Sequence, residues 1–134
     1  MKEEPNGRHR TTPVLIADDH PPMIRLVAAM LVHLGFAEMD DATDGAQALE
    51  LMRRRRYGLV ISDWHMAPMS GFALLKAVRC DPELCRTPFI MITSETRTDM
   101  VEAVRAAGAS SYILKPFGLD ILREKVWGLL GSAG

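Results

Sequence analysis

Five polar residues of this sequence stand where short apolar runs end. They are Asp18, Asp19, Asp63, Thr93 and Lys115. The runs before them are too short for helices and rich in β-branched residues, so they indicate buried strands. If the strands are parallel, their carboxyl ends meet at one edge of a sheet, where ligands of open α/β folds bind. We therefore expect these five side chains to form one site.

The chemistry of such a site follows from its charges. Three carboxylates at one edge repel one another and raise one another's pKa, unless a hard cation binds or Lys115 compensates. Oxygen ligands alone favour Mg²⁺, which also accepts phosphate oxygens. Beside a metal and an ammonium, a carboxylate can attack a phosphoryl group and hold it as an acyl phosphate. The residues predict Mg²⁺-dependent phosphoryl chemistry; the alternative is that each one only ends a strand.

Strand-like and helix-like segments alternate five times along the chain. The predicted strands are 14–17, 36–42, 59–61, 89–92 and 111–114; the predicted helices lie between 23 and 34, 44 and 56, 72 and 80, 98 and 107, and 119 and 129. Asp44 with Gln47 resembles a capping box, and Thr98 or Asp99 is expected to cap the fourth helix. This alternation predicts an α/β fold with a doubly wound, five-stranded parallel sheet, in which 36–42 is an edge strand.

Length, charge and composition limit the number of domains and the classes of partner that we expect. The 134 residues suit one domain, and we expect a disordered polar tail over 1–12, in which His9 is solvated, a single domain over 13–131, and no effector domain. The net charge is −1, and the run Arg53–Arg56 is expected to be a solvated helix end that complements the helix dipole. No apolar stretch is long enough to span a membrane. We expect a cytoplasmic protein that binds neither nucleic acid nor membrane.

The sequence resembles the response regulator receiver domain, and is nearest to the stand-alone, CheY-like chemotaxis type. The resemblance covers about residues 12–130 and implies a strand order of 2-1-3-4-5. The stretches that carry it are Ala17-Asp18-Asp19, Ala42-Thr43-Asp44-Gly45, Ile61-Ser62-Asp63-Trp64-His65-Met66, Met69-Ser70-Gly71-Phe72-Ala73-Leu74-Leu75-Lys76, Met91-Ile92-Thr93-Ser94-Glu95, and Gly108-Ala109-Ser110-Ser111-Tyr112-Ile113-Leu114-Lys115-Pro116-Phe117.

The resemblance implies a role for each residue at the strand ends. Asp63 would accept a phosphoryl group from the phosphohistidine of a histidine kinase or a histidine phosphotransfer protein. The Mg²⁺ ligands would be Asp19, Asp63 and the backbone carbonyl of His65, with Asp18 acting through water. Lys115 would contact the phosphoryl group, and its peptide bond to Pro116 would be cis.

The same resemblance implies which residues change conformation on phosphorylation and which residues set the lifetime of the phosphoryl group. Thr93 would swing toward the phosphoryl group, and Tyr112 would turn inward to fill the vacated space, unless it is plain core. His65 and Glu95 would set the lifetime of the phosphoryl group, or His65 would only offer its carbonyl. Trp64 is expected to be a partly exposed reporter of metal and phosphate binding. The family usually has Met-Pro after the acceptor, whereas this sequence has Met66-Ala67-Pro68, so the loop there is expected to differ.

The resemblance also implies an output through protein binding. The surface of the fourth helix, fifth strand and fifth helix would bind a partner once Asp63 is phosphorylated, and the protein would not be a turnover enzyme. A flagellar motor switch is the favoured target, with a phosphorelay shuttle and a phosphate sink as alternatives; a monomer is expected, and a dimer stays open. Two other classes are alternatives: a haloacid-dehalogenase-like phosphatase, which needs an Asp where His65 stands, and a flavodoxin-like module, which needs a phosphate loop where 18–22 is acidic and proline-rich.

Overall fold

Five strands alternate with five helices in the computed structural model, which describes residues 9–131. The strands are β1 Pro13–Ala17, β2 Glu38–Ala42, β3 Leu59–Asp63, β4 Phe89–Thr93 and β5 Ser111–Leu114. The helices are α1 Pro21–His33, α2 Gly45–Arg54, α3 Gly71–Cys80, α4 Thr98–Ala106 and α5 Leu119–Leu130. None of the helices in this part of the chain is long and apolar enough to cross a membrane.

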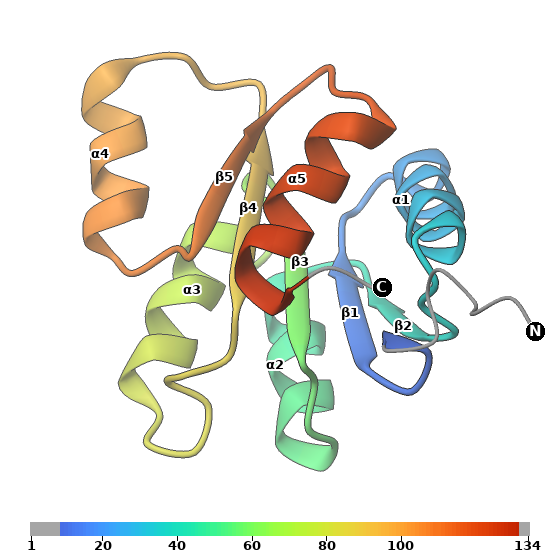
Figure 1. Ribbon diagram of the computed structural model, residues 1–134. Coiled ribbons are helices and arrows are strands. Elements are labelled where there is room, and N and C mark those ends of the chain that lie inside the picture. Colours follow the sequence, from blue (N-terminus) through green and yellow to red (C-terminus); the bar gives the residue numbers. More distant parts are fainter. Residues whose placement is uncertain (1–8, 132–134) are drawn as a thin grey trace, which may run out of the picture.

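The strands form one parallel sheet in the order β2-β1-β3-β4-β5, so both the predicted fold class and the strand order are confirmed. Helices α1 and α5 cover one face of the sheet, and α2, α3 and α4 cover the other (Figure 1). The chain order of the strands reverses between β1 and β3. Ligands of such sheets bind beyond the carboxyl ends of the strands at this reversal.

Each strand contributes to two separate apolar layers, because successive side chains point to opposite faces. Val14 and Ile16 of β1 pack against α1 and α5, whereas Leu15 between them packs on the opposite side. Every residue of the central strands β3 and β4 is buried. Both strands are therefore held firmly on two faces, and so are the polar residues at their ends, Asp63 and Thr93.

The cap of α2 follows its prediction closely. Asp44 accepts a hydrogen bond from the backbone N–H of Gln47 at 2.8 Å. In return, Gln47 Oε1 accepts one from the backbone N–H of Thr43, also at 2.8 Å. The reciprocal pair thus reaches back one residue further than in the standard capping box.

The cap predicted for α4 was wrong. The residue before the helix is Arg97, whose side chain makes no cap hydrogen bond, and Thr98 is already helical. The reason is local competition: Glu95 Oε2 accepts the N–H of Arg97 at 2.9 Å, and Asp99 Oδ1 accepts the N–H of Met100 at 3.0 Å. Both carboxylates therefore act on backbone groups around the first turn, without a Thr or Asp at the cap position.

The edge strand β2 is rich in carboxylates and is tied to the end of α2. Arg55 binds Glu38 at 2.9 Å and Asp40 at 2.8 Å. The phenol of Tyr57 donates to Asp40 at 2.6 Å. Burial, and then this hydrogen bond, raise the pKa of Tyr57 to about 12. The four arginines at this helix end are exposed, as predicted, but Arg55 also fastens the edge of the sheet.

The expectation of a solvated His9 was wrong. Its side chain is only 5% exposed. The ring stacks on Phe36 with 5.1 Å between centroids, and Nε2 lies 2.8 Å from the backbone oxygen of Gly131. These long-range contacts compensate for the cost of ordering a polar segment. The rest of the predicted tail up to residue 8 lies outside the described residues.

Candidate functional site

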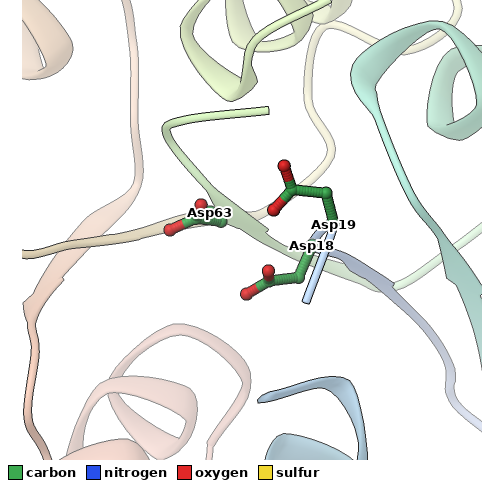
Figure 2. A group of neighbouring side chains, drawn as sticks. All are labelled: Asp18, Asp19 and Asp63. Atoms are coloured by element: carbon green, nitrogen blue, oxygen red, sulfur yellow. The ribbon is translucent and has the colours of Figure 1, made fainter. Parts of the chain in front are cut away.

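Three carboxylates gather at the carboxyl ends of β1 and β3 (Figure 2). One oxygen from each of Asp18, Asp19 and Asp63 lies within 4.8 Å of the other two. Asp18 is 4% exposed and Asp63 is 8% exposed, whereas Asp19 faces solvent. The structure therefore brings together the three acids that were predicted to meet.

Asp18 experiences the electrostatic strain of this arrangement. Its pKa is raised above the usual value, chiefly by burial and further by the negative charge of Asp63. The backbone N–H of His20 donates to Asp18 Oδ1 at 2.9 Å and opposes that rise, as does the charge of Lys115. A cation among the three carboxylates would remove most of this repulsion.

Lys115 supplies one positive charge at the same place. Its Nζ lies 2.8 Å from Oδ1 of Asp63. The backbone N–H of Lys115 donates to the carbonyl of Thr93 at 2.8 Å, and the peptide bond from Lys115 to Pro116 is cis. One ammonium offsets one of three carboxylate charges, so the remaining charge matches a divalent cation.

Gly71 lets helix α3 approach the end of β3, and sequence reasoning did not single it out. Its N–H donates to the carbonyl of Trp64 at 2.8 Å. A Cβ at this position would lie 1.9 Å from the carbonyl oxygen of Asp63 and 2.8 Å from Ser62 Oγ. A sequence signal for this tight helix start was present in Ser70, the residue before Gly71. Ser70 caps α3 by accepting the N–H of Ala73 at 3.1 Å. Gly71 thus fixes the backbone that carries Asp63.

A chain of hydrogen bonds leads from Thr93 toward α4 and β5. Thr93 is fully buried, and its hydroxyl accepts the N–H of Glu95 at 3.1 Å. The carbonyl of Glu95 accepts a hydrogen bond from the phenol of Tyr112. Tyr112 is half-buried and packs against the layer beneath α3 and α4. The residues predicted to switch are therefore linked through one backbone unit, that of Glu95.

The loop after β3 places His65 and Trp64 differently from one another. His65 is exposed, and its ring stacks on Trp64 with 5.8 Å between centroids. Trp64 is only 5% exposed, so the expected partial exposure was wrong; the indole packs on Phe72 at 5.5 Å and closes the apolar layer. The peptide bond from Ala67 to Pro68 is cis. A depression beside the carboxylates is lined by Asp19, Trp64, His65, Met66, Ala67 and Ser70.

The sequence model of a known family matches nearly the whole chain. That family is described as the response regulator receiver domain, and the match covers residues 14–127. This chain belongs to the receiver domain family. Its fold and its relatives identify it as a CheY-like receiver domain of a two-component system.

The relatives of this receiver domain include proteins of chemotaxis. It is 36% identical over 113 residues to chemotaxis protein CheY of Pseudomonas aeruginosa, covering 84% of this chain and 91% of that protein. It is 39% identical over 113 residues to CheY-3 of Vibrio cholerae, covering 84% and 87%. The structure of CheY4 of Vibrio cholerae matches with a TM-score of 0.81 at 32% identity, covering 88% and 98%.

One related structure contains a metal. It is the receiver domain of the sensor histidine kinase PA1611 from Pseudomonas aeruginosa, with a magnesium ion coordinated in its active site cleft. It matches this receiver domain with a TM-score of 0.82 at 26% identity, covering 90% of this chain and 98% of that chain.

Proposed function

We propose that this receiver domain accepts a phosphoryl group on Asp63 and thereby changes which protein it binds. The donor is the phosphohistidine of a histidine kinase or a histidine phosphotransfer protein. The observation that carries the proposal is the 2.8 Å pair of Lys115 Nζ and Asp63 Oδ1 beside the other two carboxylates. A phosphoryl group on Asp63 would put its negative oxygens where an ammonium already lies.

The donor set fits Mg²⁺, the cofactor that the family implies. Asp18, Asp19 and Asp63 offer carboxylate oxygens, and the backbone carbonyl of His65 would add another oxygen. Mg²⁺ prefers such ligands and keeps several waters, for which the exposed Asp19 leaves room. The ion in the PA1611 receiver domain supports this assignment. When bound, Mg²⁺ would neutralise charge on the phosphoryl oxygens.

The transfer itself needs little from the protein beyond a placed nucleophile. An oxygen of Asp63 attacks phosphorus while the P–N bond to the imidazole breaks, and the electron pair of that bond returns to the ring nitrogen. Lys115 then hydrogen-bonds to a phosphoryl oxygen. Thr93 turns its hydroxyl to donate to another, which takes a hydrogen-bond acceptor away from the N–H of Glu95. Tyr112, bound to the carbonyl of Glu95, follows this change.

The proposed output face is formed by α4, β5 and α5. Leu114 is 43% exposed and Ile121 is 38% exposed there. Beside them lies a cavity of about 390 Å³, lined by Val101, Val104, Arg105, Ala109, Ser110, Ser111, Tyr112 and Lys125. Exposed apolar side chains beside a cavity suit a protein partner. The same cavity touches Tyr112, so a change at Tyr112 alters the surface that a partner would contact.

The partner is best sought in motility, because curated relatives are chemotaxis proteins. We take a flagellar motor switch component as the target; a phosphorelay shuttle and a phosphate sink are the alternatives. In each case the protein works in the cytoplasm as a monomer, its own aspartate being the acceptor in place of an external substrate. Neither nucleic acid nor a membrane takes part.

We assign the lifetime of the phosphoryl group to His65 and Glu95. His65 is exposed beside the depression that adjoins Asp19, and Glu95 follows Thr93 by two residues. From these positions both side chains can border the path of a hydrolytic water. Dephosphorylation rates of His65→Ala and His65→Asn that equal the wild-type rate would remove His65 from this role.

Acetyl phosphate with Mg²⁺ tests the central assignment. Intact-mass spectrometry should find one phosphoryl group on the wild type and none on Asp63→Asn, which keeps the shape of the side chain without the nucleophile. Equal labelling of both proteins would refute the assignment. Lys115→Ala should fold and bind Mg²⁺ but not switch. Capture of the phosphorylated protein by motor-switch proteins or by phosphotransfer proteins then distinguishes the outputs.

A further inference from the structure

Helix α4 is held more firmly at its C-terminal end than at its N-terminal end. Val104, in the last turn, is the one buried residue among the nine of this helix, all of which the structure describes. Thr98 and Asp99 in the first turn are exposed, and the cap residue Arg97 makes no side-chain cap hydrogen bond. Met100 in the first turn packs against the core but is only partly buried. A helix with so few buried apolar contacts resists displacement weakly. What holds its C-terminal end therefore matters for how it moves.

Arg79 of α3 holds that end with a fork of hydrogen bonds. Its Nε donates to the carbonyl of Gly108 at 2.8 Å, and Nη2 donates to Ser110 Oγ at 3.2 Å. On its other side, Nη1 donates to the carbonyl of Thr87 at 2.7 Å and to that of Cys85 at 3.1 Å. One planar guanidinium thus joins the segment after α4 to the segment before β4.

Arg79 acts as a structural hydrogen-bond donor and not as one half of a surface ion pair. Its acceptors are three carbonyls and a hydroxyl, and no carboxylate within residues 9–131 forms a salt bridge with it. Burial lowers the pKa of this guanidinium. Gly108 has φ +106°, and a Cβ there would lie 3.0 Å from Arg79 Cγ, so the backbone lies directly on the arginine stem. Lysine has no planar fork with which to reach the same set of acceptors.

The N-terminal end of α4 is connected to the site through a bond that phosphorylation would break. The hydroxyl of Thr93 accepts the N–H of Glu95 at 3.1 Å, and Glu95 Oε2 accepts the N–H of Arg97. When Thr93 turns to a phosphoryl oxygen, the start of the helix loses this tie. The segment that Arg79 binds lies at the opposite end of α4.

We propose that Arg79 makes the C-terminal end of α4 a fixed pivot, so that phosphorylation swings the N-terminal end of the helix and reshapes the cavity beside Tyr112. Arg79 acts as a positioning residue, since it touches neither Asp63 nor the phosphoryl group. The inference rests on the proposed phosphorylation of Asp63.

Backbone amide NMR of the whole protein tests the pivot. Beryllofluoride with Mg²⁺, a stable mimic of an aspartyl phosphate, should shift the amides of residues 95–101. The amides of Ala109 and Ser110, bonded to the carbonyls of Val104 and Phe89 at 3.2 and 2.8 Å, should keep their positions and their slow exchange. Shifts over 106–110 as large as those over 95–101 in the wild type would overturn the pivot without any variant.

Two matched variants isolate the fork. Arg79→Met keeps the aliphatic stem and removes the donors; exchange of the Ala109 and Ser110 amides should rise roughly tenfold or more, and the mimic should now shift 106–110 as well. Arg54→Met makes the same change on α2, where the exposed arginine reaches Glu50 at 2.8 Å, and should leave both readings unchanged. Arg79→Lys should resemble Arg79→Met, and wild-type behaviour of this lysine variant would overturn the role of the fork.

The two proposals fail in different ways. If the mimic shifts no amide near Asp63 and acetyl phosphate adds no phosphoryl group, the proposed function falls and the pivot falls with it. If residues near Asp63 respond but both ends of α4 move equally, only the pivot is overturned.

Discussion

Adding a single methyl group at Gly71 should destabilise the protein and slow the phosphorylation of Asp63. In Gly71→Ala the new carbon would lie 1.9 Å from the carbonyl oxygen of Asp63, whereas such carbon–oxygen contacts need about 3.3 Å. The end of β3 and the start of α3 must therefore move apart by roughly 1.4 Å. Overpacking of this kind costs about 3 kcal/mol at the upper end of its usual range. The displacement also strains the 2.8 Å hydrogen bond from Gly71 to Trp64.

The assay compares this variant with Gly128→Ala, the same chemical change in α5. Nothing lies within 4 Å of a Cβ at Gly128, so alanine there should stabilise the helix by about 0.5–1 kcal/mol. Gly71→Ala should lower Tm by roughly 10 °C, whereas Gly128→Ala should raise it by a few degrees. Because Asp63 is displaced, phosphorylation by acetyl phosphate should slow roughly 100-fold in Gly71→Ala alone. Equal Tm values and equal rates for both variants would refute the reasoning.

Three further predictions follow from other contacts. An absorbance titration should give Tyr57 a pKa of about 12. The stability that its neutral phenol contributes is complete below its ordinary pKa of 10.0 and should be lost as the pH rises from 10.0 to about 12. Asp40→Asn should lower the pKa of Tyr57. His9→Ala should lower the free energy of unfolding by about 2 kcal/mol in urea titrations, because it removes a buried stack and a hydrogen bond; an unchanged midpoint would contradict the contacts. Mg²⁺ at 100 times its Kd should stabilise the wild type by about 2.7 kcal/mol in thermal unfolding, reversibly with a chelator, and Asp19→Asn much less.

The sheet and the carboxylate cluster could be predicted because their signals are local. Leu59–Ile61 is an apolar, β-branched run that ends on Asp63, and such a run is buried on both faces only in the centre of a parallel sheet. Parallel strands then deliver Asp18 and Asp19 to the same edge without any detailed knowledge of loops.

The features that the sequence did not reveal depend on distant contacts. His9 lies in a polar segment and is buried only because Phe36 and Gly131 meet it from elsewhere in the chain. The burial of Trp64 depends on how the loop after β3 folds over Phe72. In the same way, the helical pattern around Arg79 does not predict that its side chain binds two other segments of the chain.

The acidic edge strand β2 affects how two copies of the protein interact at high concentration. Within residues 9–131, no strand pairs with the outer side of β2, and an apolar strand exposed in this way would pair with a strand of another molecule. Here the strand reads Glu-Met-Asp-Asp-Ala, and Arg55 holds Glu38 and Asp40 in place without covering Asp41, which stays exposed. An approaching copy would bring like charges into register and desolvate them. The charges of β2 therefore disfavour edge-to-edge pairing between the sheets of two copies.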